Sequence, residues 1–206
     1  MLGNLAIVLA LPILISSSMS SHYSFIVKED SWLSLSGSSS VNSFECISNS
    51  EIVRGNVIVS LDELNRTLNF SNATLKIDIK SFDCKNPFLN KDFYKALGAE
   101  KNPFITIELL DANTKKQTSS GHKGSIMASV SITINEKCKI VEIPIDWQRV
   151  DKTRFRFLGF KELNMTDFEI TPPSPAFGII KVHNEIVITF NLLVETNTFA
   201  SLSEKF

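Results

Sequence analysis

The chain has 206 residues, of which 43% are hydrophobic and 21% are charged, and its formal net charge is −1 at pH 7. This is the composition of a globular protein with one sizeable core, so a single domain is expected. A near-neutral charge provides no electrostatic footprint for nucleic acid or for an anionic membrane surface. The sequence therefore predicts neither of those partners.

The beginning of the chain contains a continuous apolar run, Leu5 to Ile15, followed by the small polar stretch "SSSMSS". The run is about half as long as a membrane-spanning helix requires. An apolar segment followed by small residues is typical of a cleaved secretory signal, and an uncleaved anchor is the alternative. We expect residues 1–21 to be a signal peptide and residues 22–206 to form one domain without an integral membrane span. The mature protein would then be periplasmic or secreted.

Alternation of apolar and polar residues with a period of two recurs along the chain and predicts β-strands. Eight such segments are counted, at residues 33–41, 52–61, 73–82, 104–112, 125–134, 138–150, 153–163 and 184–195. Their mostly hairpin-length connections favour antiparallel pairing. Eight antiparallel strands favour a closed barrel, with a two-sheet sandwich as the alternative. Residues 61–72 and 170–182 are predicted to be long loops.

One short helix is predicted between two prolines, in the stretch "CKNPFLNKDFYKALGAEKNPF". It would span about residues 90–98, with Asn90 as the N-cap and Gly98 at the exit. A helix of this length is not stable alone in water. We therefore expect an apolar stripe that includes Phe93 and Leu97 to pack onto one end of the barrel and to close it.

The three cysteines are Cys46, Cys84 and Cys138. An exported protein meets an oxidising compartment, so one disulfide and one remaining thiol are expected. We favour the pair Cys46–Cys84, because both residues lie at predicted strand ends beside loops, whereas Cys138 lies in a tight hairpin. Three unpaired, buried thiols are the alternative. No CxxC pair or histidine partner accompanies these residues, so no metal site is expected.

The order of the motifs resembles the YceI-like family of exported, lipocalin-like barrel proteins. The resemblance covers roughly residues 32–195, and its strongest parts are the helix segment and the ending "LNMTDFEITPPSPAFGIIKVHNEIVITFNLLVE". It implies an eight-stranded antiparallel lipocalin-like barrel with the helix over one end. It also implies binding of a polyisoprenoid or another amphiphilic lipid in an apolar lumen, and it brings no catalytic residues.

The aromatic composition is dominated by 15 phenylalanines, against two tyrosines and two tryptophans. Phenylalanine carries no polar group that needs a partner when it is buried. The predicted ligand-binding residues at the lumen or its mouth are Phe93, Leu97, Phe104, Trp147, Phe155, Phe157, Phe168, Phe177 and Phe190. The same side chains would also fill a closed barrel. That alternative is a non-enzymatic interaction or structural module of the cell envelope.

Signatures of catalysis are missing from the sequence. His22, His122 and His183 are scattered without metal-ligand spacing, and there is no GxSxG elbow or phosphate-binding loop. We therefore expect no catalytic residue, no cofactor and no metal. The expected partner is a hydrophobic small molecule, an isoprenoid or another lipid, and the sequence leaves open whether the protein is an oligomer.

Overall fold

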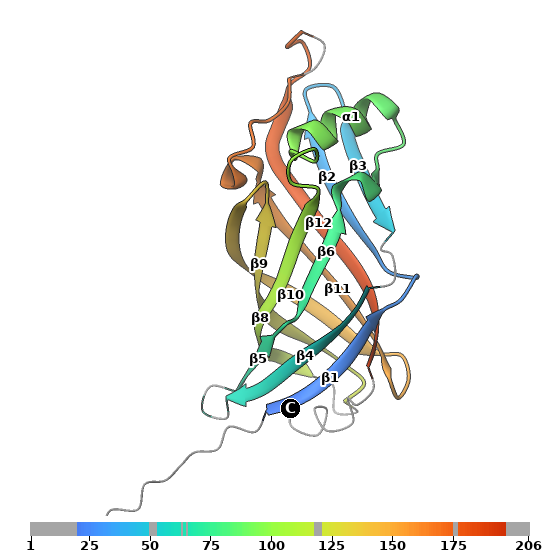
Figure 1. Cartoon of the computed structure of the whole chain (residues 1–206), viewed down its shortest axis with the longest axis vertical. Coiled ribbons are helices and arrows are strands. Elements are labelled where there is room, and N and C mark those ends of the chain that lie inside the picture. The colour runs from blue at the N-terminus through green and yellow to red at the C-terminus, as the bar shows by residue number, and fades with distance from the viewer. Residues whose placement is uncertain are drawn as a thin grey trace, which may run out of the picture.

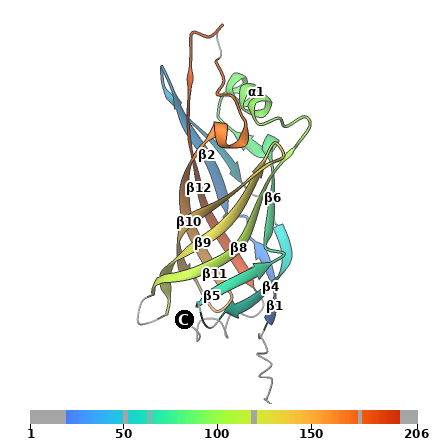
Figure 2. The same cartoon turned by 90° about the vertical axis from the view of Figure 1, so that its left-hand side faces the viewer.

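The computed structural model describes residues 20–49, 53–62, 64, 66–117, 121–174 and 177–196. Within these ranges the chain consists mainly of β-strands, with one α-helix and two short 3₁₀ helices. The strands wind into a tall barrel, and the helix lies at one end of it (Figures 1 and 2). In the described part of the chain, no helix combines the length and the apolar character needed to cross a membrane.

The strands are β1 (Ser20–Val27), β2 (Trp32–Ser39), β3 (Ser43–Asn49), β4 (Val53–Asp62), β5 (Thr67–Ser71), β6 (Thr74–Asp78), β7 (Phe82–Asp83), β8 (Phe104–Gln117), β9 (Lys123–Ile134), β10 (Lys137–Arg149), β11 (Arg154–Asn164) and β12 (Val182–Thr196). The helices are η1 (Ile79–Ser81), α1 (Pro87–Ala96) and η2 (Met165–Phe168).

The sheet closes on itself through a ring of eight strands. Their order is β1-β4-β5-β8-β9-β10-β11-β12, and β1 also pairs with β12. Three further strands continue members of the ring. β2 comes after β1 in the chain and also pairs with β12, and β6 comes after β5 and also pairs with β8. β3 precedes β4 in the chain and pairs with β2. The predicted eight-stranded antiparallel barrel is thus confirmed, with three of its strands interrupted. The sandwich alternative does not apply.

The interruption between β1 and β2 is held by hydrogen bonds to β12. The Lys28 amide donates to the Leu193 carbonyl at 2.8 Å, and the Leu193 amide donates to the Ser31 hydroxyl at 2.9 Å. Ser31 is almost fully buried. Its side chain therefore replaces a missing ladder partner, so the backbone of β12 stays satisfied across the gap.

Three strands of the barrel were not predicted. β5 lies within residues 61–72, so the prediction of a long loop there is wrong. β5 is only five residues long and is fixed by its neighbours β4 and β8, which its own sequence does not reveal. β3 and β1 were also missed. β1 begins at Ser20, inside the range expected to be the signal peptide, and the rest of that range, residues 1–19, lies outside the described residues.

The helix begins earlier than predicted. Its N-cap is Asn86, whose side chain accepts hydrogen bonds from the amides of Phe88 at 2.9 Å and Leu89 at 3.3 Å. Pro87 then occupies the first helical position, where its missing N–H costs nothing. Gly98 follows the helix with a φ of +70°, as its predicted place at the exit requires.

Asn90, predicted as the N-cap, instead ties the start of α1 to β7. Its side chain accepts from the Cys84 amide at 2.7 Å and donates to an Asp83 carboxylate oxygen at 3.1 Å. This bond and those from Lys85 lower the pKa of Asp83 from 3.8 to about 2. The carboxylate thus stays charged, and stays bonded, at any pH above about 4.

The end of the barrel next to α1 is packed solid. Ile79, Phe82, Ile134 and Phe168 are completely buried there. The ring of Phe93 on α1 lies 5.5 Å from the ring of Phe82, measured between centroids. The expectation that α1 packs onto one barrel end is therefore confirmed, and the core beneath it leaves that end closed.

The disulfide Cys46–Cys84 is present, as predicted, and Cys138 is a free, exposed cysteine. The bridge joins β3 to the segment immediately before α1, and both cysteines are buried. It closes a loop whose ends are 38 positions apart in the sequence. The disulfide therefore ties the helix segment to the barrel wall.

Replacement of both Cys46 and Cys84 by alanine should lower the free energy of unfolding by about 4 kcal/mol, because the unfolded chain regains the entropy of the open loop. Urea denaturation of the oxidised protein measures this loss. Cys138→Ala is the control and should change the unfolding free energy by less than about 0.5 kcal/mol, since its side chain is exposed. Equal effects of the two changes would show that the bridge does not stabilise the fold.

Candidate functional site

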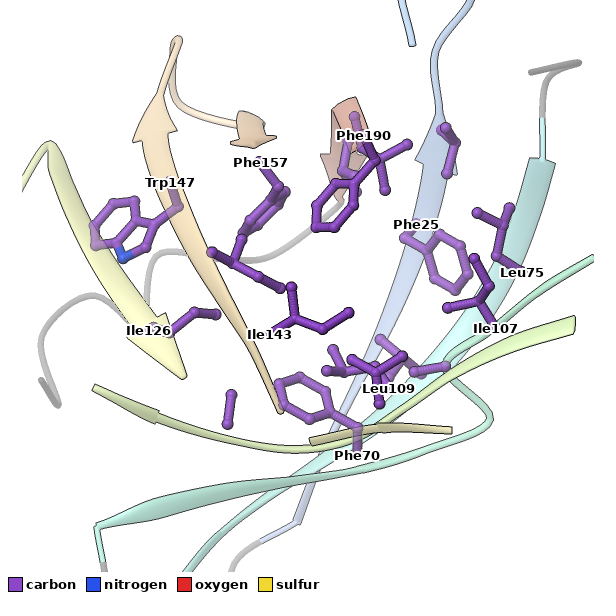
Figure 3. Close-up of a pocket in the computed structure, with 18 of the residues that line it drawn as sticks. Phe25, Phe70, Leu75, Ile107, Leu109, Ile126, Ile143, Trp147, Phe157 and Phe190 are labelled. Atoms are coloured by element: carbon purple, nitrogen blue, oxygen red, sulfur yellow. The ribbon is translucent and has the colours of Figure 1, made fainter. Parts of the chain in front are cut away.

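The interior of the barrel contains an apolar cavity of about 300 Å³. Each of the eight strands of the ring contributes at least one side chain to its wall, and Figure 3 shows these side chains converging on a common space. The labelled ones are Phe25, Phe70, Leu75, Ile107, Leu109, Ile126, Ile143, Trp147, Phe157 and Phe190. A cavity of this size lies at the lower end of the range for small-molecule pockets, about 300–1,000 Å³.

The lining offers almost no polar groups. Among the described residues that form it, Thr74 has the only hydroxyl, Trp147 has an indole N–H, and no side chain is titratable. Water in such a space would lack the two to four polar partners that hold a buried water molecule. The cavity is therefore suited to a hydrocarbon, and its lining provides no titratable group for acid–base chemistry.

The cavity extends toward the end of the barrel opposite α1. Trp147 near the end of β10, Phe155 near the start of β11 and Val194 near the end of β12 all line it. No residue of α1 does. The barrel thus has one packed end beneath the helix and a hollow region that reaches the other end, so the helix does not form the wall of the cavity.

Two glycines explain why large aromatic side chains leave this space open. Gly159 on β11 lies directly opposite Phe190 on β12, and Gly55 on β4 lies opposite Phe25 on β1. A Cβ atom on Gly159 would lie 2.5 Å from the Phe190 Cζ, and one on Gly55 would lie 2.7 Å from the Phe25 ring. The outer part of each ring therefore lies over a glycine of the neighbouring strand, in the space that a side chain there would fill.

Four of the nine predicted ligand-binding residues line the cavity. They are Trp147, Phe155, Phe157 and Phe190. The rings of Trp147 and Phe155 lie 6.4 Å apart between centroids, on adjacent strands. The alternation in "RFRFLGF" correctly indicated that Phe155 and Phe157 share a face.

The other five predicted residues lie elsewhere. Phe93, Leu97 and Phe168 pack in the core near α1, Phe104 is 48% exposed at the start of β8, and Phe177 is fully exposed. None of them lines the cavity. They were grouped with the others by residue type and by nearness to the helix segment, and neither property shows which end of the barrel a side chain faces. Contact of any of the nine with a ligand stays a prediction.

Most of the lining consists of aliphatic side chains that the sequence analysis did not single out. Leu75, Ile107, Ile126 and Ile143 are examples, and each occupies an alternating position of a predicted strand. The period-two pattern could have found them. This pattern marks the inward face of every strand. The predicted set consisted mostly of phenylalanines, and two of these lie in the packed end near α1.

Other candidate groups lie outside the cavity. No set of three or more His, Cys, Asp or Glu side chains in the described ranges is arranged to hold a metal ion. His183 shares a hydrogen bond of 2.9 Å with the Ser38 hydroxyl. Hydrogen bonds from Thr153 and Arg154 lower the pKa of Asp151 to about 2, in the turn between β10 and β11. These contacts are structural.

Comparison with protein families and solved structures agrees with this architecture. The family model described as "YceI-like domain" matches residues 34–194, which is most of the chain. No curated protein matches the sequence.

Two solved structures have the same fold. BcnA from Burkholderia cenocepacia is 17% identical with a TM-score of 0.57, and the match covers 84% of this chain and 99% of that one. A polyisoprenoid-binding domain from Saccharophagus degradans, implicated in plant cell wall breakdown, is 11% identical with a TM-score of 0.59. That match covers 84% of this chain and 98% of that one.

Gly159→Ala should shrink the cavity, because the new methyl group would force the Phe190 ring away from the wall. We expect a loss of about 1–3 kcal/mol in the free energy of unfolding and a lower uptake of a hydrophobic fluorescent probe. Gly37→Ala is the matched control. Its Cβ would lie 2.8 Å from the Phe44 Cζ, in a glycine–phenylalanine pair that does not line the cavity. The control should lose stability and keep its uptake. Undiminished uptake by Gly159→Ala would contradict this role of the glycine.

Proposed function

The chain belongs to the YceI-like domain family, and from this premise we propose that it is a non-enzymatic, exported protein that binds a long-chain apolar or amphiphilic molecule inside the barrel. A polyisoprenoid is one such molecule. The single observation that carries the proposal is the apolar cavity of about 300 Å³ within the ring of strands. The protein would sequester or carry its ligand without changing it.

The driving force would be the transfer of hydrocarbon out of water. Each methylene group that enters an apolar environment contributes about 0.8 kcal/mol. A ten-carbon segment would thus contribute about 8 kcal/mol, from which the several kcal/mol lost on association must be subtracted. The lining supports such a ligand class because it offers hydrocarbon on all sides.

The similarity to the polyisoprenoid-binding domain of Saccharophagus degradans supports the same class of ligand. At 11% identity this similarity concerns the fold, so the identity of the lipid is our proposal and rests on the cavity. The apolar lining suits both an unbranched acyl chain and a branched isoprenoid chain.

Export is supported by two independent features. The apolar run Leu5 to Ile15 has the pattern of a secretory signal. The disulfide Cys46–Cys84 is expected to persist in an oxidising compartment, and a reducing cytosol would disfavour it. Both features support a periplasmic or secreted location.

The alternative function, a structural or interaction module, predicted a lumen filled by phenylalanines. The cavity favours the carrier, since Phe25 and Phe190 lie against the wall and leave the middle of the barrel open. Ligand access through the end opposite α1 fits the position of the cavity, and it would not require the helix to move.

Leu109→Trp should reduce ligand binding at least tenfold, because the larger side chain would occupy the cavity. Leu158→Trp is the matched control: it makes the same substitution on an exposed leucine of β11. Native mass spectrometry of the protein, with and without added polyprenols or fatty alcohols, measures the bound fraction. The control should bind like the unmodified protein.

Two outcomes would contradict the proposal. One is a protein that takes up neither added isoprenoids nor alkyl chains after mild purification. The other is an equal loss of binding in both variants, which would place the ligand outside the cavity.

A further inference from the structure

At the barrel end opposite α1, the wall of the cavity continues into two polar side chains. On β10, Ile143, Ile145 and Trp147 alternate into the cavity, and Arg149 is the next residue with this orientation. On β12, Val194 lines the cavity and Thr196 is the next in the alternation. Both side chains therefore follow directly on the apolar lining, where β10 and β12 end.

Arg149 is held against the cavity wall. It lies directly across from Phe155 in the ladder between β10 and β11. Its guanidinium carbon lies 5.5 Å from the centroid of the Phe155 ring, in the geometry of a cation–π contact. Phe155 is 3% exposed and lines the cavity. A permanently charged group thus lies over an aromatic ring that faces the hydrocarbon space.

Two buried polar atoms at this end have no hydrogen-bond partner in the described part of the chain. They are the Arg149 Nε and the Thr196 Oγ1, and Thr196 is only 2% exposed. A buried polar group without a partner costs about 1–3 kcal/mol. No ion pair is formed by Arg149 within the described ranges, whereas its neighbour Arg154 pairs with Asp151.

The two side chains are close neighbours of the same lining residues. β11 lies between β10 and β12, so Phe155 pairs with Arg149 on one side and with Val194 on the other. Thr196 in turn pairs with Phe25, another lining residue. A ligand in the cavity would meet these polar groups at one end and, apart from the Thr74 hydroxyl and the Trp147 indole N–H, only hydrocarbon elsewhere.

We propose that this end of the cavity binds the head group of an amphiphile that carries an anionic oxygen, a carboxylate or a phosphate, with its hydrocarbon tail directed toward the α1 end. This inference rests on the proposed function and adds the chemistry and the orientation of the ligand. Arg149 donates charge-assisted hydrogen bonds to the head group, and the Thr196 hydroxyl donates a second bond. Both side chains must turn toward the cavity for the ligand to supply the partners that these atoms lack, because neither atom is accessible as it lies.

The first test compares three ligands with the same tail: dodecanoate, dodecyl phosphate and dodecanol. We expect both anions to bind the unmodified protein at least tenfold more tightly than dodecanol, as a charge-assisted hydrogen bond implies. Arg149→Met should remove this difference and leave the affinity for dodecanol unchanged. The tighter of the two anions distinguishes a fatty acid from a lipid phosphate as the source of the head group.

Arg156→Met is the matched control, since Arg156 lies on the opposite face of β11 and donates to Asn191 at 2.7 Å. It should keep the preference for anions. Equal affinities for the three ligands, or an unchanged preference in Arg149→Met, would overturn this inference and leave the proposed function intact. Failure of all three ligands to bind would also overturn this inference, and it would overturn the proposed function only if added isoprenoids failed to bind as well.

Thr196→Val tests the second group. It removes a buried hydroxyl without a partner, so the ligand-free protein should melt at an equal or higher temperature. Its affinity for dodecanoate should fall severalfold, with no change for dodecanol. An unchanged affinity for dodecanoate would overturn the assignment of Thr196.

The orientation has its own readout, which does not depend on a change at the head-group site. Trp147 lines the cavity near this end, and Trp32→Phe removes the other tryptophan of the chain. Bromine quenches indole fluorescence at short range. Dodecanoate brominated at carbon 2 should therefore quench Trp147 more strongly than dodecanoate brominated at carbon 12. The reverse order would overturn the proposed orientation.

Discussion

The closure of the sheet between β1 and β12 is the constraint on which the interior of this protein depends. Three residue pairs form it: Phe25↔Thr196, Ile26↔Glu195 and Val27↔Val194. Beyond them, the Ser31 hydroxyl takes the place of a ladder partner for Leu193, and β2 then continues along β12. Because the ring is closed and has no free edge, every second side chain of each strand points into the barrel. The inward side chains around the cavity are almost all apolar, so they enclose an apolar space.

The two ends of that space are built differently, and the difference gives the barrel a direction. Beneath α1, buried side chains such as Phe82 and Phe168 fill the interior, and the disulfide Cys46–Cys84 secures the helix segment above them. Toward the other end, Gly55 and Gly159 let two phenylalanine rings lie against the wall, and a cavity remains. A packed core stabilises the fold, whereas a cavity costs stability. The proposed binding function would explain why the barrel keeps a cavity that lowers its stability.

The polar atoms at the hollow end fit the same view. A protein that only needed a stable barrel would gain by replacing the Thr196 hydroxyl with a methyl group, since the hydroxyl is buried without a partner among the described residues. Arg149 over Phe155 is a similar case, in which a charge lies beside hydrocarbon. Buried polar groups without a partner are rare in native structures, so each needs a specific explanation, and a bound ligand is the one that we propose.

The sequence by itself determined most of the strand pattern, the single helix and its exit at Gly98, because these depend on local periodicity and turn chemistry. Periodicity favoured a closed antiparallel barrel but left a sandwich open, and it missed β1, β3 and β5. The sequence also indicated the disulfide. It did not determine which residues meet in the cavity. Phe155 and Phe168 have the same side chain, yet one lines the hollow space and the other lies in the packed end. Only the register of the ring places Gly159 opposite Phe190 and brings Arg149 and Thr196 to the same end, since these pairings join residues that are distant in the chain.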